Sequence, residues 1–190
     1  MQALVDWCKM VYPKSLESLI NYYKKLPGIG EKNAERLALA TLNFKEEDID
    51  NFAKSLEDVK KKIRKCKICG HLSEDEICDI CKDDGRDHNL ICVIEDYKSV
   101  FSFEKAGNYK GVYHVLNGLI SPADNIGPDN INLASLVKRV EEAEKPELIL
   151  ALKSTVEGET TTLYIKKIFE NKDVVISRLS YGIPMGAEID

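Results

Sequence analysis

Four cysteines within a short stretch place the strongest constraint on what this chain can fold into. They form two C-x-x-C pairs, Cys66 with Cys69 and Cys78 with Cys81, and eight residues separate the pairs. Each pair directs two thiolates toward one point, and two pairs supply the tetrahedral shell of four sulfurs that Zn²⁺ accepts. Four protein ligands leave no open coordination position. The spacing therefore predicts one structural, non-catalytic zinc ion per chain.

Two disulfide bonds are the alternative use of the same cysteines. Disulfides are typical of oxidising compartments, and the first fourteen residues lack the basic start and apolar run of a secretory signal. Two adjacent pairs also disfavour a thioredoxin-type redox site, so zinc is favoured. His71 is a spare ligand candidate that we expect to face solvent. Cys8 stands alone, and Cys92, inside an apolar run, is predicted to lie in the core.

A tight turn between two helices is predicted at residues 26–30, Leu-Pro-Gly-Ile-Gly. Apolar residues at 16, 19, 20 and 23 mark an amphipathic helix before the turn. Pro27 and Gly28 end that helix, because proline lacks an N–H donor and glycine tolerates positive φ. Gly30 then opens a second helix, which carries Ala34 and Ala38 on one face.

This hairpin has the parts of a phosphate-binding site. The first N–H groups of the second helix lack helical partners and lie at its positive dipole end. Lys32 and Arg36 follow one turn apart, so their side chains project from one side. We expect Gly28, Gly30, Lys32 and Arg36 to contact DNA phosphates without reading sequence. An ordinary helix–helix corner, using glycine and proline only for packing, is the alternative.

The charge of the chain is unevenly distributed. A net charge of −5 over 190 residues argues against non-specific nucleic-acid affinity of the molecule as a whole. Residues 1–69, however, carry 14 Lys and Arg against 10 Asp and Glu, whereas residues 70–190 carry 13 against 22. The hairpin lies in the basic part. No run of 18 apolar residues occurs, so we expect no membrane span and, by default, a cytoplasmic location.

The acidic part alternates between short apolar runs and amphipathic segments. We predict strands at 90–94, 111–116, 148–152 and 174–176, helices at 99–106, 133–144 and 160–169, and a loop at 121–128. Such alternation implies right-handed βαβ crossovers and a largely parallel sheet. The predicted fold class is α/β, with a helical region and a small four-cysteine module before the sheet.

Three glutamates follow predicted strands. Glu95 comes after the first strand, and Glu157 and Glu159 come after the third. Carboxylates at neighbouring strand ends can converge and hold Mg²⁺. The second interpretation is that Glu157 and Glu159 only complement the dipole of the helix that they open. Spacing alone does not separate these two interpretations.

The ordered set of features resembles the RecR recombination-mediator family over residues 15–190. The matching strings are residues 26–30, the four cysteines, Arg86-Asp87, residues 111–116, Ser121-Pro122, residues 156–159 and residues 182–186. The resemblance implies a Toprim fold for the acidic part and a homodimeric or homotetrameric ring that clamps single- or double-stranded DNA. It also implies that the protein works with RecO and RecF partners to load the recombinase RecA.

The resemblance also implies residue roles. Lys32 and Arg36 take the DNA-contact positions of the family, while Glu95, Glu157 and Glu159 take the Toprim acidic positions. In this family those acidic positions are linked to partner binding more than to catalysis. We expect a helix-hairpin-helix domain at 15–65, the zinc finger at 66–81 and the Toprim-like domain at 88–180, flanked by an extension at 1–14 and a C-terminal segment at 181–190.

Three departures from the family pattern stand out. The first fourteen residues precede the usual start of family members. Lys153-Ser154-Thr155 stands where the family tends to have an Asn-Pro pair, and the chain stops at Asp190, where family members continue. We therefore expect a changed loop at 153–155 and a changed assembly at the C-terminus.

Two other functions compete with the mediator. The first is a Mg²⁺-dependent Toprim enzyme of the nuclease or primase kind, but such enzymes pair an early Glu with a later Asp-x-Asp. Here the later pair is Glu157-Gly158-Glu159, whose longer side chains displace the carboxylates. The second is a zinc-ribbon adaptor that binds only protein. We predict no catalytic residues.

Overall fold

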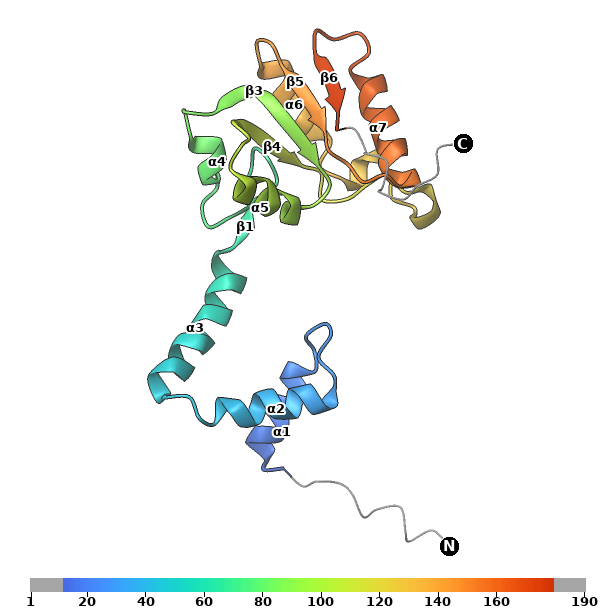
Figure 1. Ribbon diagram of the computed structural model, residues 1–190. Coiled ribbons are helices and arrows are strands. Elements are labelled where there is room, and N and C mark those ends of the chain that lie inside the picture. Colours follow the sequence, from blue (N-terminus) through green and yellow to red (C-terminus); the bar gives the residue numbers. More distant parts are fainter. Residues whose placement is uncertain (1–11, 180–190) are drawn as a thin grey trace, which may run out of the picture. The chain divides into compact units, whose positions relative to one another are not determined.

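The computed structural model describes residues 12–179 of the chain (Figure 1). The chain divides into two compact units, Met1–Lys60 and Lys61–Asp190, and each is described by itself. Most of the predicted extension at 1–14, the single Cys8, and the string at 182–186 lie outside the described residues. None of the helices within 12–179 is long and apolar enough to cross a bilayer.

The N-terminal unit consists of helices α1 (Lys14–Tyr23), α2 (Glu31–Thr41) and most of α3 (Glu46–Lys62). Helices α1 and α2 pack through a small core in which Ile20, Ala34 and Ala38 are buried. The Tyr23 and Thr41 hydroxyls lie 2.9 Å apart and add a hydrogen bond between the two helices. Both helices of the hairpin were predicted, and the structure confirms them.

The C-terminal unit begins with the four-cysteine module. A short antiparallel pair, β1 (Arg64–Lys65) and β2 (Leu72–Ser73), flanks the first two cysteines, and helix α4 (Asp79–Lys82) follows Cys78. These elements are too short to be stable through their own hydrogen bonds. The module therefore depends on the cysteine cluster and on contacts with the sheet that follows.

The sheet of this unit has four parallel strands in the order β4-β3-β5-β6. Their bounds are β3 (Asp87–Ile94), β4 (Gly111–Val115), β5 (Glu147–Leu150) and β6 (Val175–Arg178). Three helices connect them, namely α5 (Tyr97–Ala106), α6 (Ala134–Glu142) and α7 (Val156–Ile168). The predicted α/β class and parallel sheet are confirmed (Figure 1).

Alternate residues of β3 pack into two separate apolar cores. Ile91 and Val93 belong to the core that contains residues of α6 and α7, whereas Cys92 and Ile94 belong to the core that contains Val100 of α5. Helices therefore cover both faces of the sheet, which explains why the strand sequence is continuously apolar. The predicted core position of Cys92 is confirmed, since only 2% of this residue is exposed.

A half-buried ion pair joins the residue before β3 to α5. The Arg86 guanidinium donates to both carboxylate oxygens of Glu104, at 2.6 and 3.0 Å, and also to the carbonyl of Gly111 at 3.1 Å. The Tyr113 hydroxyl donates to the same carboxylate at 2.7 Å. Both oxygens of Glu104 thus accept hydrogen bonds from the sheet region.

Helix α7 begins four residues earlier than predicted. Thr155 is its N-cap, and the Thr155 hydroxyl accepts a hydrogen bond from the N–H of Gly158 at 3.2 Å. This cap extends the helix through the Glu157-Gly158-Glu159 string. The predicted loop at 121–128 contains a short 3₁₀ turn, Pro122–Asp124, and a second one begins at its end, Pro128–Asn130.

Candidate nucleic-acid interface, metal centre and acidic pocket

The connection between α1 and α2 is a tight hairpin held by its own backbone. The N–H of Leu26 donates to the carbonyl of Tyr23 at 3.0 Å, and the N–H of Ile29 donates to the carbonyl of Leu26 at 3.1 Å. Gly28 has a φ of 80°, a conformation that glycine adopts without strain. The turn is therefore fixed by sequence, with glycine at the position that needs it.

The N-terminus of α2 presents an open surface beside the two glycines. Gly30 is the N-cap and has no side chain that could cap the helix. A Cβ atom built at Gly28 or Gly30 would meet no atom within 4 Å. First-turn N–H groups lack helical partners and lie at the positive end of the dipole, so this surface suits an anionic oxygen.

Cations lie close to this surface. Lys32 and Arg36 are both exposed, and the two lie one turn apart on α2, as the spacing predicted. Lys24 and Lys25, just after α1, are exposed as well, and Lys24 forms an ion pair with Glu31. We did not predict these two lysines as DNA contacts from the sequence. Their position immediately before the Leu-Pro-Gly turn could have indicated them.

The four cysteines of the C-terminal unit converge on one point. All four are buried, and their sulfur atoms lie within 4.8 Å of one another. Cys69 Sγ and Cys78 Sγ are 3.6 Å apart. A tetrahedral site with Zn–S bonds near 2.3 Å needs sulfur separations of about 3.8 Å, so the cluster fits a zinc ion. It is the one group of three or more ligand-type side chains at such spacing within residues 12–179.

Backbone hydrogen bonds shape both cysteine loops. In the first loop, the N–H of Cys66 donates to the carbonyl of His71 at 2.7 Å, and the N–H of Gly70 donates to the carbonyl of Cys66 at 2.9 Å. In the second, the N–H of Cys78 donates to the sulfur of Cys66 at 3.3 Å. Hydrogen bonds to the sulfur of Cys66, first from Cys69, lower the pKa of its thiol, which favours the thiolate that zinc binds.

The first cysteine loop is bonded directly to the end of β4. The N–H of Val115 donates to the carbonyl of Cys69 at 2.7 Å, and the Asn117 amide donates to the carbonyl of Gly70 at 3.3 Å. Gly70 has a φ of 74°, and a Cβ there would lie 2.6 Å from the Asn132 amide nitrogen and 2.8 Å from the carbonyl oxygen of Val115. Only glycine fits this contact between the metal module and the sheet.

The prediction that His71 faces solvent is wrong. His71 is 6% exposed, and its ring packs edge-on against Phe101 of α5 with centroids 5.0 Å apart. Burial lowers the pKa of His71, which keeps the ring neutral. A short segment between two cysteine pairs gives no sign of a partner thirty residues away. Because four cysteines complete the cluster, His71 packs beside the site instead of binding its ion.

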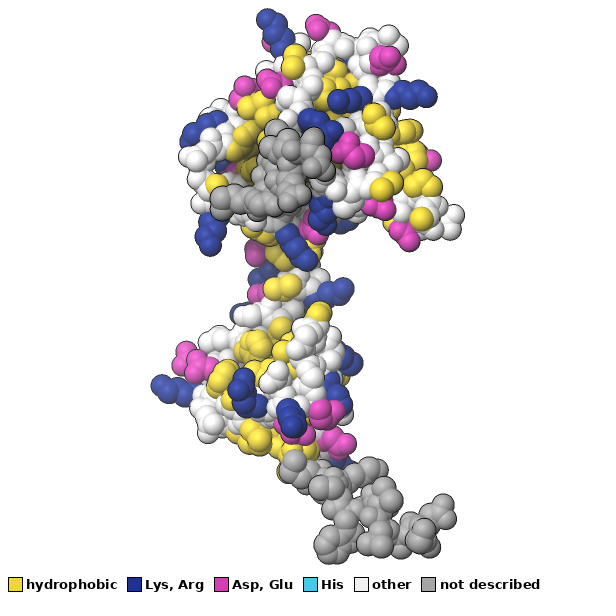
Figure 2. Space-filling model, turned by 45° about the vertical axis from the view of Figure 1, so that its right-hand side comes forward, with side chains coloured by type: hydrophobic (Ala, Val, Ile, Leu, Met, Phe, Trp, Pro, Cys, Tyr) yellow, Lys and Arg dark blue, Asp and Glu magenta, His cyan; other side chains and the backbone are white. Residues whose placement is uncertain are grey.

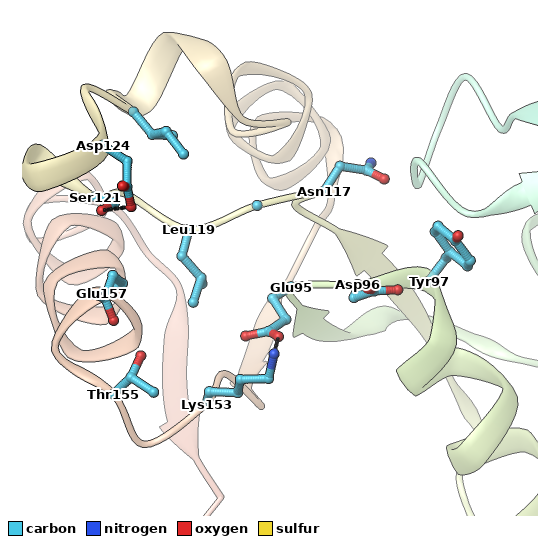
Figure 3. Close-up of a pocket in the computed structure, with 12 residues that line it drawn as sticks. Glu95, Asp96, Tyr97, Asn117, Leu119, Ser121, Asp124, Lys153, Thr155 and Glu157 are labelled. Carbon is cyan, nitrogen blue, oxygen red and sulfur yellow. Dashed lines mark hydrogen bonds and ion pairs between the residues drawn. The ribbon is translucent and has the colours of Figure 1, made fainter. Parts of the chain in front are cut away.

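An acidic pocket of about 470 Å³ lies at the carboxyl ends of β3, β4 and β5 (Figure 3). Parallel sheets place functional side chains at this edge. Glu95 and Asp96 enter from the end of β3, Asn117 from the end of β4, and Lys153 from the connection after β5. Glu157 reaches the pocket from the first turn of α7.

Glu95 already has a cationic partner in this pocket. The Lys153 ammonium forms an ion pair with Glu95 Oε1, and the Glu95 side chain is only 11% exposed (Figure 3). Glu95 Oε2 is buried and has no hydrogen-bond partner among the described residues. The Lys153 residue that departs from the family pattern thus neutralises one of the predicted acidic positions.

The structure does not bring the three predicted glutamates together. Glu95 and Glu157 line the same pocket, but Glu159 faces Arg178 at the end of β6 and forms two hydrogen bonds with its guanidinium, at 2.8 and 3.0 Å. The N–H of Glu157 and the Thr155 hydroxyl lower the pKa of the Glu157 carboxyl, as expected for an acid that complements a helix N-terminus.

Family models match three successive parts of the chain. A family model for the RecR helix-hairpin-helix matches residues 16–60, and one for the RecR zinc finger domain with four cysteines matches residues 63–83. A Toprim domain model matches residues 89–180.

Full-length relatives show the same similarity. The chain is 47% identical to "Recombination protein RecR" of Staphylococcus aureus strain MRSA252 over 181 residues, which cover 95% of this chain and 91% of that protein. It is 46% identical, with the same coverage, to the protein of the same name from strain JH9.

Proposed function

Because this chain belongs to the RecR family of recombination proteins, we propose that it is a DNA-binding mediator of recombinational DNA repair. It acts as an oligomeric clamp, a homodimer or homotetramer, that binds single- or double-stranded DNA independently of sequence. It works in the cytoplasm with RecO-like and RecF-like proteins to load a RecA-type recombinase on single strands. The observation that carries this proposal is the open, cationic N-terminus of α2.

The hairpin supplies phosphate contacts only. Gly28 and Gly30 let a phosphate approach the free N–H groups of α2, while Lys32 and Arg36 neutralise its charge. The side chains of the turn are apolar or absent and cannot hydrogen-bond base edges, so binding is independent of sequence. One hairpin makes few contacts, and the net charge of the chain is −5. Repeating the hairpin in an oligomer raises the effective concentration of each further contact.

The acidic pocket serves as a docking site for a protein partner rather than as a catalytic centre. Two observations support this assignment. Lys153 forms an ion pair with Glu95, and Arg178 forms one with Glu159, so two of the three carboxylates already have cationic partners. A Mg²⁺ ion at this site would have to displace the Lys153 ammonium from Glu95. A basic side chain of a partner can instead pair with Glu157 and Asp124 without breaking either ion pair.

The catalytic alternative has a direct test. Purified protein is incubated with labelled single- and double-stranded DNA and Mg²⁺, and we expect no cleavage or strand joining. Activity that is lost in Glu95→Ala would establish a Toprim enzyme and overturn the mediator assignment. Isothermal titration with MgCl₂ tests the same site, and we expect no binding at millimolar concentrations.

The DNA-binding assignment is tested by removing the two cations of α2. We expect Lys32→Ala with Arg36→Ala to weaken binding of fluorescently labelled single-stranded DNA at least tenfold at low salt. The matched control is Lys166→Ala with Lys167→Ala, which removes the same charge from exposed positions of α7. Equal losses of DNA affinity in both variants would show that the effect depends on net charge and not on the position of the cations on α2. Unchanged binding by the α2 variant would refute the clamp and leave the protein-binding adaptor.

A further inference from the structure

A groove of about 480 Å³ lies between the four-cysteine module and α5. One wall comes from β2, the segment after it and α4, and the other wall comes from α5. The groove shares no lining residue with the acidic pocket at the strand ends. We call it the module groove, and its walls include Leu72, Glu74, Asp79, Val100, Phe101 and Glu104.

Both walls of the module groove are fixed to the sheet. On one side, the N–H of Val115 in β4 donates to the carbonyl of Cys69 in the first cysteine loop, at 2.7 Å. On the other side, Val100 anchors α5 because its side chain is fully buried in the core. A site whose walls are fixed before binding loses little conformational entropy when a ligand enters. The module groove is therefore preformed.

The interior of the groove is apolar and includes an exposed aromatic ring. Leu72 and Ile80 are half-buried and Val100 is buried, whereas Phe101 is 54% exposed. Phe101 contacts the ring of His71, with centroids 5.0 Å apart and planes at 63°. The face of an aromatic ring attracts cations, and exposed aromatic residues in pockets are common anchor points for partners.

Every charged side chain that lines the module groove is acidic. The four are Glu74, Asp75, Asp79 and Glu104. Lys82 pairs with the second of these, and Arg86 pairs with the last. The other two carboxylates are exposed, and neither forms an ion pair within residues 12–179. Figure 2 shows acidic and basic side chains interspersed on the visible face of the C-terminal unit, so a lining of one sign distinguishes this groove.

His71 adds an unsatisfied polar group to the wall of the groove. The residue is 6% exposed, and its Nδ1 has no hydrogen-bond partner in the part of the chain that the structure describes. Buried polar atoms are hydrogen-bonded in the large majority of cases. An unpaired nitrogen at the wall of a cavity therefore points to a ligand that brings polar groups of its own, as a polypeptide does.

We propose that the module groove binds an extended, arginine-containing segment of a partner protein. The planar guanidinium lies against the Phe101 ring and donates hydrogen bonds to Glu74 and Asp79. Apolar neighbours of the arginine pack beside Leu72 and Val100. DNA and anionic membrane surfaces do not fit, because the acidic rim repels phosphates. This inference goes beyond the proposed function, which uses neither wall of the groove.

Fluorescence polarisation with labelled octapeptides tests the chemistry of the ligand. The full-length protein is titrated against peptides in which arginine alternates with leucine, glutamate alternates with leucine, or arginine alternates with glycine. We expect the arginine–leucine peptide to bind about tenfold more tightly than either of the others, since it alone offers both cations and apolar side chains. No measurable binding of this peptide at about 1 mM would overturn the proposal. Equal affinity for this peptide and either of the others would overturn it as well.

Variants of the groove test where the arginine–leucine peptide binds. We expect Glu74→Gln with Asp79→Asn to weaken binding about tenfold, because two cationic contacts are lost. Phe101→Leu keeps an apolar side chain but removes the ring face, and it should weaken binding about threefold. Because Phe101 is exposed, this variant remains decisive even if the double variant lowers the zinc content. The matched control is Glu170→Gln with Asp173→Asn, which removes the same two charges from exposed positions after α7 and should bind as the wild type does.

The acidic pocket at the strand ends is the competing location for a basic peptide. Glu157→Gln with Asp124→Asn changes that pocket and should leave the affinity for the arginine–leucine peptide unchanged. A larger loss of affinity in this variant than in the groove variants would place the peptide in the acidic pocket and contradict the proposal. Equal losses in all of the double variants, the control included, would show that binding depends on net charge alone, which also contradicts it.

Discussion

The N–H of Val115 donates a hydrogen bond of 2.7 Å to the carbonyl of Cys69, so the last residue of β4 is bonded to a cysteine of the metal cluster. Gly70 packs against the same end of the strand at a distance that excludes any side chain. The metal module and the sheet are thus one structural piece. Loss of the metal should therefore destabilise the sheet.

Zinc removal is therefore expected to lower the stability of the whole C-terminal unit. We predict that elemental analysis finds one zinc per chain. After chelation, we expect the melting temperature measured by circular dichroism to fall by roughly 10 °C or more. Adding zinc back to the stripped protein should restore the original melting temperature. A metal content well below one per chain would contradict the zinc site. Unchanged sheet melting would contradict the coupling.

Gly158 should be intolerant of any side chain. A Cβ at this position would overlap the carbonyl oxygen of Lys153, so the backbone must shift. We expect Gly158→Ala to reduce the free energy of unfolding by about 2 kcal/mol in urea denaturation. The control is Gly127→Ala, where the nearest atom would be 3.6 Å away. Equal stability of the two variants would show that the loop after β5 accommodates the methyl group.

Stability should depend on the protonation of His114. This residue is fully buried, its Nε2 pairs with the Asn132 carbonyl at 2.8 Å, and its Nδ1 has no partner among the described residues. Burial lowers the pKa of His114 to about 4. In the unfolded chain the pKa returns to about 6.5, so the unfolded state binds the proton first as pH falls.

The sign follows from this order of protonation. The contribution of neutral His114 is fully present above a pH of about 6.5 and is lost progressively as pH falls toward about 4. Between pH values of about 7.5 and 5.5 we expect the free energy of unfolding to drop by about 1 kcal/mol from this group. In His114→Gln the same interval should lack that drop, whatever the absolute stability of the variant. An identical pH slope in both proteins would contradict the assignment.

The ion pair between Arg86 and Glu104 should matter more than a surface pair. The Arg86 side chain is 17% exposed and donates two hydrogen bonds to the carboxylate, so its removal leaves a half-buried charge without its partner. We expect Arg86→Ala to cost about 3 kcal/mol in denaturant unfolding. Tyr113→Phe, which removes one hydrogen bond to the same carboxylate, should cost about 1 kcal/mol. Comparable costs for the two variants would argue against the bidentate pair as the stronger contact.

Local patterns in the sequence were enough for much of this structure. The Leu-Pro-Gly-Ile-Gly turn, the two C-x-x-C pairs and the four apolar strands are each specified by residues close together in the chain. For the same reason, the predicted strand at 90–94 was correct in type and differed only at its start, since β3 begins at Asp87.

Tertiary partners distant in sequence account for the rest. The position of His71 depends on Phe101, and that of Glu159 depends on Arg178, and neither partner is visible from local spacing. The pairing of Lys153 with Glu95 joins two strand ends that are far apart in the chain.

The most direct test of the clamp is the salt dependence of its DNA affinity. Each phosphate contact on a single strand contributes about 0.7 to the slope of log Kobs against log salt concentration. If Lys32 and Arg36 each neutralise one phosphate, the Lys32→Ala with Arg36→Ala variant should have a slope smaller by about 1.4 per engaged subunit. The control variant at 166 and 167 should keep the wild-type slope. An α2 variant whose slope equals that of the wild type would contradict the proposal that Lys32 and Arg36 bind DNA phosphates.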